Sequence, residues 1–385
     1  MSTRQLRVLM VTTDFPPSLG GIQQWTAQLA SQLSTRHAVT VVAPRYPGSA
    51  AYDAAAPYDV VRYRQSRRRP LALGALALTT LREVLRQRPD VVLFSHIFAA
   101  FAAHPFCRKL GIPYVVAAHG LEIQARRVQR FLGAILRHGA RCIAVSRHTA
   151  LLLQDKGIPP AAITVVGNGV HAGLLTAAPR PGTTQHQRIA GDGPVILTLA
   201  RLDERYKGHD MMLQALPLIR ARVPDVTYVI TGDGRYRHYY ERLATALGVR
   251  DHVIFTGRVT DEERLALYDR CDLFALISRE VPDGGCEGFG IVFLEAAARG
   301  KPAVGGRSGG VPDAIADGVT GLLVEPTDVD AIADACVRLL TDRDLAQRMG
   351  CSGRERVRTA YTWEHIARQV DEILQSASRH TKAAA

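Results

Sequence analysis

The sequence predicts an α/β protein built from two doubly wound domains that face a deep cleft. Three observations support this. At 385 residues the chain is too long for one ordinary core. Short apolar runs alternate with helix-periodic segments in both halves, as in parallel sheets covered by helices. Between residues 176 and 194 the alternation gives way to a stretch rich in Pro, Gly, Thr and Gln, which predicts an interdomain linker.

The first half opens on a buried-strand pattern that leads into a glycine loop. The apolar run at 7–12 is followed by Gly20 and Gly21 and then by a helix-periodic segment at 22–33. A strand, a glycine loop and a helix together favour phosphate binding, because glycine lets the backbone approach an anion at the helix N-terminus. Turn geometry alone would also explain the two glycines. Further strands are predicted at 39–43, 91–94, 114–118, 142–145 and 164–166, and further helices at 71–88 and 98–110.

His119 follows the predicted strand 114–118 directly and precedes Gly120. Ligands of open α/β sheets bind outside the carboxyl ends of the strands, so His119 is a candidate site residue. A structural histidine is the alternative.

The segment 123–141 reads as a basic amphipathic helix. Arg126, Arg127 and Arg130 alternate there with apolar residues, which is typical of a helix that lies on an anionic membrane surface. A helix packed on the sheet with a solvated arginine face is the alternative.

The second half repeats the strand and helix pattern. Strands are predicted at 195–200, 226–231, 253–257, 273–277, 302–305 and 320–324, and helices after 208, from 289, and at 328–341, 344–359 and 363–376. We therefore expect Rossmann-like domains at 1–185 and 186–362. The remaining segment, 363–385, is expected to be a helix that returns to the first domain, followed by a tail.

Two carboxylates with seven residues between them, Glu287 and Glu295, mark the candidate site of the second half. Glu287 precedes a glycine-flanked turn, Gly288-Phe289-Gly290, which opens an apolar helix, and Glu295 lies about two turns inside that helix. Free amides at the start of a helix favour a phosphate. The two carboxylates could then hold hydroxyls on either side of a bound diphosphate, as a nucleotide sugar would require.

Two cations, Arg201 and Lys207, follow the first strand of the second half. Arginine offers a planar fork and lysine a point charge, so together they can neutralise a diphosphate without a metal. No acidic cluster with metal-ligand spacing occurs, and we expect no metal and no cofactor beyond a nucleotide sugar as co-substrate.

The formal net charge of +12 is uneven: residues 1–190 carry 23 Lys and Arg against 7 Asp and Glu, and residues 191–385 carry 25 against 29. A basic first half predicts an anionic partner. The six scattered cysteines favour a reducing compartment, and no secretory signal or membrane-spanning segment is predicted. A cytoplasmic protein, peripheral on the inner face of the cell membrane, fits these features.

In order along the chain, these motifs resemble those of the retaining glycosyltransferases of family four, which have the GT-B fold. The residues that carry the resemblance are Gly20-Gly21, His119, Arg201 with Lys207-Gly208, Gly232-Asp-Gly, Phe255-Thr-Gly-Arg258, Glu287-Gly-Phe-Gly with Glu295, and Ser308-Gly-Gly-Val-Pro-Asp313. The opening Asp14-Phe-Pro-Pro-Ser-Leu-Gly-Gly is most similar to the GDP-mannose-dependent phosphatidylinositol mannoside mannosyltransferases.

The resemblance implies roles for these residues. Arg201 and Lys207 would stabilise the departing nucleoside diphosphate, Glu287 would hold hydroxyls of the donor sugar, and Glu295 would hold the ribose hydroxyls. Gly20 and Gly21 would approach phosphate and acceptor, and His119 would contact the donor sugar or its phosphate. Gly232 and Arg258 would border the base, and Gly309 and Gly310 would offer amides near the diphosphate. The segment 279–286 departs from the family pattern, which leaves the acceptor open.

The sequence therefore predicts a metal-independent, retaining transferase that moves a hexose, mannose by preference, from a GDP- or UDP-linked donor to a glycolipid or lipid-linked acceptor. Transfer from a UDP-sugar to a soluble small molecule is the alternative within the class. Outside the class, a nucleic-acid-binding protein would explain the basic half but lacks a basic platform interleaved with aromatic residues. A dinucleotide oxidoreductase is disfavoured because no Gly-x-Gly-x-x-Gly follows the first strand.

Overall fold

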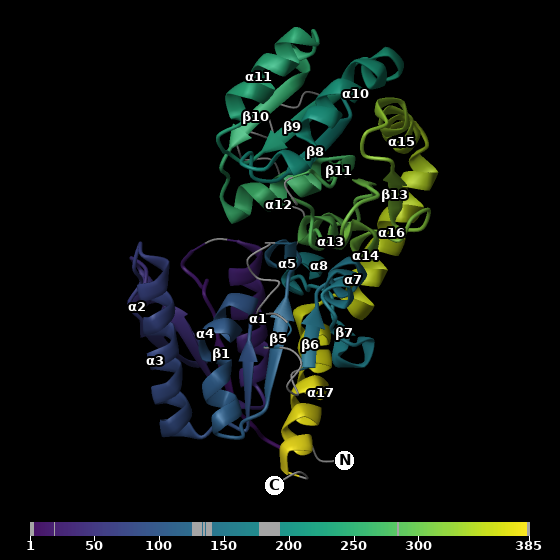
Figure 1. Cartoon of the computed structure of the whole chain (residues 1–385). Helices are drawn as coiled ribbons and strands as arrows, with labels where there is room; N and C mark the ends of the chain where they lie inside the picture. Colours follow the sequence, from purple (N-terminus) through teal and green to yellow (C-terminus); the bar gives the residue numbers. More distant parts are fainter. Residues whose placement is uncertain are drawn as a thin grey trace. The chain divides into compact units, whose positions relative to one another are not determined.

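The computed structural model describes residues 4–18, 20–124, 133, 135, 141–176, 193–282 and 285–382. The chain forms two compact units (Figure 1): unit 1 is Met1–Gly169 with Trp363–Ala385, and unit 2 is Val170–Thr362. Most of the predicted basic helix at 123–141, including Arg126, Arg127 and Arg130, lies outside the described residues.

Unit 1 contains a seven-stranded sheet in the order β3-β2-β1-β4-β5-β6-β7, with every neighbouring pair parallel. Leu9 at its centre lies opposite Thr40 on one side and Val92 on the other. The order reverses between β1 and β4, which makes this pair the topological switch point. The strands are β1 (Arg7–Val11), β2 (Ala38–Pro44), β3 (Asp59–Tyr63), β4 (Val91–Phe94), β5 (Tyr114–Ala118), β6 (Arg141–Ala144) and β7 (Ile163–Val165).

Helices cover both faces of this sheet, since its strands are apolar on both sides. On one face, Leu9, Val92 and Phe94 pack under α3 (Arg69–Gln87), α4 (Ile97–Lys109) and α7 (Arg147–Asp155). On the other face, Met10 and Leu93 pack under α1 (Gly21–Ser34), which includes Trp25, and under α17 (Trp363–Lys382). Short elements complete the unit: α2 (Ser49–Ala55), α5 (Leu121–Gln124) and η1 (Pro160–Ala162).

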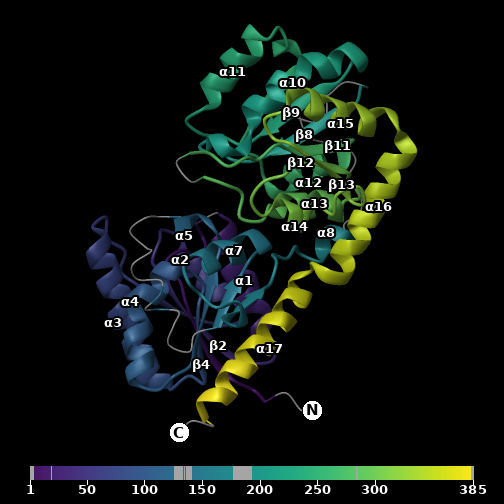
Figure 2. The same ribbon diagram turned by 45° about the vertical axis from the view of Figure 1, so that its right-hand side comes forward.

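The C-terminal helix α17 lies beside α1 and contacts β4 and β5, so the chain ends on the unit in which it began (Figure 2). A buried hydrogen bond fixes it there: His37 Nε2 donates to Asp371 Oδ1 at 2.9 Å, and His37 Nδ1 accepts a hydrogen bond from the Leu6 amide at 3.2 Å.

Unit 2 contains a six-stranded parallel sheet in the order β10-β9-β8-β11-β12-β13, with its switch point between β8 and β11. The strands are β8 (Val195–Leu199), β9 (Thr227–Thr231), β10 (Val253–Gly257), β11 (Leu273–Leu276), β12 (Ala303–Gly306) and β13 (Gly321–Val324). The helices are α8 (Gly173–Thr176), α10 (His209–Arg222), α11 (Arg237–Ala246), α12 (Asp261–Arg270), α13 (Ile291–Ala298), α14 (Val311–Ala314), α15 (Val329–Thr341) and α16 (Arg343–Ala360), with single 3-10 turns η2 (Arg205–Lys207) and η3 (Arg250–His252).

The core of unit 2 has the same two-sided character. One face of the sheet packs against α10 and α15 through residues such as Met212, Leu216 and Cys336, and on the other face Phe274 meets Phe293 of α13 edge to face at 5.4 Å. Two doubly wound parallel sheets with helices on both sides were predicted, and this architecture is confirmed.

Two details differ from the sequence analysis. Strand β3 was not predicted, because Asp59–Tyr63 is a half-exposed edge strand and not a continuous apolar run. Unit 2 begins at Val170, ahead of the compositional break near 185, because Val170 pairs with Thr362 and the carbonyls of Leu174 and Leu175 accept hydrogen bonds from Arg299 and Arg354.

Candidate functional site

The predicted site residues lie beyond the carboxyl ends of the strands in both units. In unit 2, Arg201 and Lys207 follow β8 and Glu287 follows β11, so they come from the two strands of the switch point. In unit 1, Gly20 and Gly21 follow β1, and His119 follows β5. These are the positions where parallel α/β sheets bind ligands.

Lys207 and Glu287 form a direct ion pair. The Lys207 Nζ atom lies 2.6 Å from Glu287 Oε2, and both side chains are largely buried, at 15% and 14% exposed. Burial by itself would lower the pKa of Lys207, but the Glu287 carboxylate more than offsets this and holds that pKa above its ordinary value. A fixed positive charge therefore lies at the switch point of unit 2, next to a fixed carboxylate.

Arg201 differs from Lys207 in its surroundings. Its side chain is 68% exposed and pairs with Glu204 of the same loop at 2.6 Å. Such an exposed pair is weak, because water screens it. The Arg201 guanidinium can therefore leave Glu204 for a ligand at little cost.

The turn after Glu287 is set by close backbone contacts. Gly290 has φ +92° and is the N-cap of α13, while the Phe289 ring is buried. A Cβ on Gly310 would lie 2.0 Å from the Gly288 carbonyl oxygen, so only glycine fits there. The Gly310 amide donates to the Glu287 carbonyl at 2.7 Å. That amide is thus engaged within the protein, and a role for Gly309 and Gly310 in binding a diphosphate stays a prediction.

Glu295 is buried and has partners on both carboxylate oxygens. Arg264 of α12 donates to Oε1, and the Tyr268 hydroxyl donates to Oε2 at 2.9 Å. Burial raises the pKa of Tyr268, and the neighbouring Glu295 raises it further. The carboxylate thus joins α12 to α13, and its predicted contact with ribose stays a prediction.

The residues predicted to border the base lie at the ends of β9 and β10. The Gly232 amide donates to the Gly257 carbonyl at 2.9 Å, and a Cβ on Gly232 would lie 2.1 Å from the Ala200 carbonyl oxygen. Gly232 therefore lets the turn after β9 touch the loop after β8. Arg258 follows β10 and is exposed.

In unit 1 the site is built from histidines and backbone groups. His119 Nε2 donates to the Ser95 carbonyl at 2.9 Å, so a neutral His119 keeps its lone pair on Nδ1. Its backbone amide donates to Glu122 at 2.6 Å, and Trp25 of α1 packs edge to face on the ring at 5.3 Å. Gly20 and Gly21 lie at the start of α1, one turn from Trp25.

The sequence analysis missed His96, which caps α4 two residues after the end of β4. Its Nδ1 accepts from the Phe98 amide, and its ring stacks with His119 at 6.5 Å. Burial lowers the pKa of His96. The reasoning that selected His119, a polar residue directly after a buried strand, would also have selected His96. The sequence analysis also missed Asp210, Arg264 and Arg279. Each forms an ion pair with a residue far away in the sequence, which no local sequence pattern indicates.

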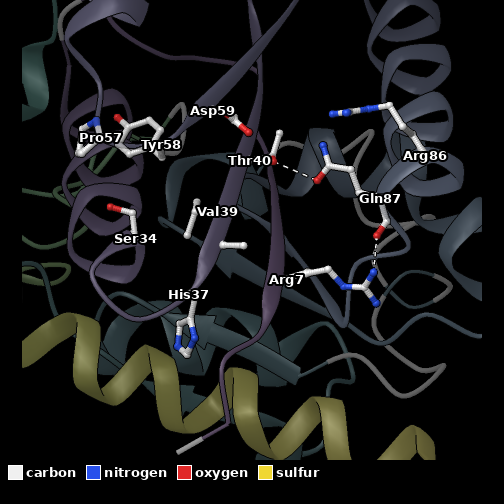
Figure 3. A pocket seen from close by; sticks show the side chains of 11 residues that line it. Arg7, Ser34, His37, Val39, Thr40, Pro57, Tyr58, Asp59, Arg86 and Gln87 are labelled. Carbon is white, nitrogen blue, oxygen red and sulfur yellow. Dashed lines mark hydrogen bonds between the residues drawn. The ribbon is translucent and has the colours of Figure 1, made fainter.

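A cavity lies at the opposite end of the unit 1 sheet, beside the amino ends of its strands. The cavity has a volume of about 530 Å³. Figure 3 shows the side chains that line it, among them Arg7, Thr40, Asp59 and Gln87. The Gln87 side chain accepts from Thr40, and its carbonyl accepts from Arg7 at 2.8 Å. These contacts hold β1 and β2 to α3, and we assign the cavity no function.

Within the described part of the chain, no three His, Cys, Asp or Glu side chains are grouped so that they could hold a metal ion. Among the same residues, no helix is long and apolar enough to cross a membrane.

Comparison with known proteins gives matches over both units. Residues 19–173 match the family model "Glycosyltransferase Family 4", and residues 181–356 match "Glycosyl transferases group 1". The chain is 36% identical over 376 residues to a GDP-mannose-dependent alpha-(1-6)-phosphatidylinositol monomannoside mannosyltransferase of Mycolicibacterium smegmatis, covering 95% of this chain and 98% of that one. It is 30% identical to the corresponding monoacylated-substrate enzyme of Corynebacterium glutamicum, covering 97% and 99%.

Solved structures show the same fold at lower identity. The Anabaena protein HepE in complex with UDP and glucose superposes with a TM-score of 0.78 at 20% identity, over 97% of this chain and all of that one. Sucrose-phosphate synthase from Thermosynechococcus elongatus superposes with a TM-score of 0.79 at 21% identity, over 99% of this chain and all of that one.

Proposed function

Because the chain belongs to the glycosyltransferases of family four and has their GT-B fold, we propose that it transfers mannose from GDP-mannose to a phosphatidylinositol mannoside or a similar glycolipid. The observation that carries this proposal is the buried Lys207–Glu287 pair at the switch point of unit 2. The Lys207 ammonium can stabilise a diphosphate, and the Glu287 carboxylate can accept hydrogen bonds from sugar hydroxyls. Family membership also sets aside the nucleic-acid-binding and oxidoreductase alternatives.

In the proposed reaction the bond between the sugar C1 and the diphosphate oxygen breaks, and negative charge grows on that oxygen. Lys207 and Arg201 lie where they can stabilise this charge. Glu287 accepts hydrogen bonds from the sugar hydroxyls and keeps C1 in place. The acceptor hydroxyl attacks C1 from the side of the leaving group, and its proton passes to the leaving phosphate oxygen, so the anomeric configuration is retained.

The proposal needs no metal ion, since two protein cations are available for the leaving group. Lys207 is fixed by its buried partner, and Arg201 is free to move from Glu204. His119 and His96 in unit 1 offer hydrogen-bonding groups for the sugar or the acceptor. No cofactor other than the nucleotide sugar is involved.

We further propose that unit 1 binds an anionic membrane surface, where its lipid acceptor resides. Helix α3 carries three strongly exposed leucines, Leu71 (59%), Leu78 (68%) and Leu85 (58%). A seven-residue spacing keeps them on one side of the helix. Exposed arginines lie before, within and after the segment that contains these leucines: Arg64, Arg67, Arg68, Arg69, Arg82 and Arg88. Apolar side chains that can enter a lipid interface beside cations that face anionic headgroups support peripheral attachment to the inner leaflet.

The function is tested by incubating the purified protein with GDP-mannose labelled in the sugar, vesicles that contain phosphatidylinositol monomannoside, and EDTA. We expect labelled glycolipid, and an α-linked product from the α-linked donor. UDP-glucose with the same acceptor, and GDP-mannose with free inositol, are the comparisons. Transfer only to the soluble acceptor, or only from UDP-glucose, would contradict the proposal within the class, and a requirement for magnesium would contradict its metal-independent form.

Membrane attachment is tested by co-sedimentation with vesicles of phosphatidylcholine alone or with phosphatidylinositol added. The triple variant Leu71→Ser, Leu78→Ser, Leu85→Ser should lose most of its binding to the anionic vesicles. Leu151→Ser, on α7, removes an equally exposed leucine (59%) and is the matched control. A second variant, with Arg126, Arg127 and Arg130 changed to Glu, tests the basic segment. Binding unchanged in both would end the membrane proposal.

A further inference from the structure

In unit 2 the turn that carries Lys207 is joined to the loop after β11 by a second ion pair. Arg279 lies just beyond β11, and its Nη1 and Nη2 atoms donate to the two carboxylate oxygens of Asp210 at 2.9 and 2.7 Å. Both side chains are shielded, at 14% and 7% exposed. Two parallel hydrogen bonds fix the orientation of the arginine as well as its distance.

The same arginine also binds the other end of that turn. The Arg279 backbone amide donates to the Tyr206 carbonyl at 2.8 Å. Arg279 thus holds residue 206 through its main chain and residue 210 through its side chain. Lys207 lies between these two points.

The backbones of the two segments touch directly beside Lys207. Gly208 has φ +73°, and a Cβ there would lie 1.8 Å from the Ile277 carbonyl oxygen. A Cβ on Gly285, farther along the loop, would lie 2.8 Å from the Tyr206 ring. The turn therefore has little freedom to shift along the loop as long as Arg279 holds it.

We propose that Arg279 and Asp210 are positioning residues for glycosyl transfer: they hold the 206–210 turn so that the Lys207 ammonium stays beside Glu287 at the donor diphosphate. This inference rests on the proposed function, since it takes Lys207 and Glu287 as the donor-binding groups. Neither Arg279 nor Asp210 is needed for contact with the donor. Both act through the position of Lys207.

The charges around the pair support a role in positioning. A buried ion pair contributes little net stability compared with apolar side chains of the same size, so stability alone is a weak reason to have one here. Its two directional hydrogen bonds, by contrast, restrict both the distance and the orientation of the turn. A third charge, Arg205 Nη2, lies 4.0 Å from Asp210, so the carboxylate keeps a cation nearby when Arg279 is removed.

The test uses the full-length protein with Arg279→Gln, Arg279→Lys, Asp210→Asn and the double variant Arg279→Gln/Asp210→Asn. For each, kcat, the KM values of donor and acceptor, the GDP dissociation constant and the melting temperature are measured. Arg222→Gln is the matched control, since Arg222 pairs with Asp334 on the exposed surface of the same unit.

We expect each single change to lower kcat/KM for the donor by about 10- to 100-fold, because a catalytic group that is slightly misplaced loses much of its effect. GDP affinity should fall as well, while the acceptor KM stays close to wild type. Arg279→Lys keeps the charge without the fork and should lie between wild type and Arg279→Gln. The double variant should be no worse than the poorer single variant, because both changes break one interaction.

Folded variants with wild-type GDP affinity and kcat/KM would overturn the inference, as would losses that multiply in the double variant. A lower melting temperature with unchanged GDP affinity would do the same, since it would mean a purely structural role. If the wild-type protein transfers no mannose but binds GDP, the proposed function fails, and the affinities of the variants for GDP still test the positioning role. If GDP does not bind the wild-type protein, both the proposed donor site and this inference are wrong.

Discussion

In both units a shielded arginine pairs with an aspartate close to the loop that follows the first strand, but the two arginines bind different groups. In unit 1, Arg62 of β3 is 5% exposed and pairs with Asp53 while donating to the carbonyls of Pro16 and Pro44 at 2.8 and 2.6 Å. In unit 2, Arg279 pairs with Asp210 and holds the turn of Lys207. The unit 1 arginine therefore fixes backbone, whereas the unit 2 arginine fixes a charged side chain.

This difference follows the chemistry of the two sites. Unit 2 contains two shielded ion pairs, Lys207 with Glu287 and Arg264 with Glu295, and our proposal places the donor diphosphate beside the first of them. Unit 1 presents two histidines held by backbone groups at the corresponding edge. If the proposed function holds, charge stabilisation is concentrated in unit 2, while unit 1 contributes hydrogen-bonding groups and an exposed basic surface.

The largest effect is expected from Glu287→Gln, which keeps the size of the side chain and removes its charge. Without the carboxylate, Lys207 loses its partner and the sugar loses its strongest acceptor, so we expect kcat to fall about a thousandfold, or about 4 kcal/mol. The variant should still be folded. Glu262→Gln, an exposed residue on α12, is the control. Near-normal turnover of Glu287→Gln would mean that unit 2 does not carry the charge chemistry.

The corresponding break in unit 1 is Arg62→Gln, which leaves Asp53 and two carbonyls without their donor. Removing one partner of a buried pair should lower the stability of unit 1 by about 3 kcal/mol. Both tryptophans, Trp25 and Trp363, are buried in unit 1, so urea unfolding followed by their fluorescence reports on that unit. If Arg62→Gln weakens GDP binding by as much free energy as it lowers the stability of unit 1, the two units are not separated in function as we describe.

A finer test compares the two cations of unit 2. Lys207→Met should weaken GDP binding about a hundredfold, or about 2.7 kcal/mol, since a buried and fixed charge is lost. Arg201→Met should weaken it by about tenfold or less, because that side chain is 68% exposed and its interactions are screened. Calorimetric titration with GDP measures both, and the reverse order would show that burial is not what makes Lys207 effective.

A different kind of effect, on pH dependence, concerns His209, the first residue of α10, whose side chain is 1% exposed. Burial lowers its pKa from 6.5 to about 4. The unfolded chain therefore binds a proton that the folded unit excludes between these pH values, and stability falls as pH falls through this window. Between pH 7 and pH 5 the loss is about 2 kcal/mol.

This loss should be missing in His209→Phe, which cannot be protonated. Hydrogen exchange of β8 and β9 amides at the two pH values reports on unit 2. An equal pH dependence in wild type and His209→Phe would rule out this histidine as its source.

The predictability of the two regions also differs. The sheets could be predicted because buried parallel strands are continuous apolar runs, and the edge strand β3 was missed because it is half exposed. The placement of Arg201, Lys207 and Glu287 at one edge of the sheet could be predicted from sequence, because the carboxyl ends of parallel strands meet there, whereas their role in donor binding stays a prediction. The ion pair of Asp210 could not be predicted. An aspartate in the first turn of a helix is already explained by the helix dipole, and its partner, Arg279, is 69 residues away.

The same limit applies to Glu295. The sequence analysis placed it about two turns inside the helix, but α13 begins at Ile291, so Glu295 lies just over one turn inside it. Its pairing with Arg264 and Tyr268 depends on how α12 packs against α13. Contacts between side chains of remote segments are set by tertiary packing, and no local pattern records them.

The most direct test of a metal-independent donor site in unit 2 is a calorimetric titration with GDP, UDP and ADP, first in EDTA and then with magnesium. We predict that GDP binds in EDTA, that it binds more tightly than the other two, and that magnesium changes its affinity little. At a hundredfold excess over its dissociation constant, GDP should stabilise the protein by about 2.7 kcal/mol. Binding that requires magnesium, or no binding of any of the three nucleotides, would contradict the account.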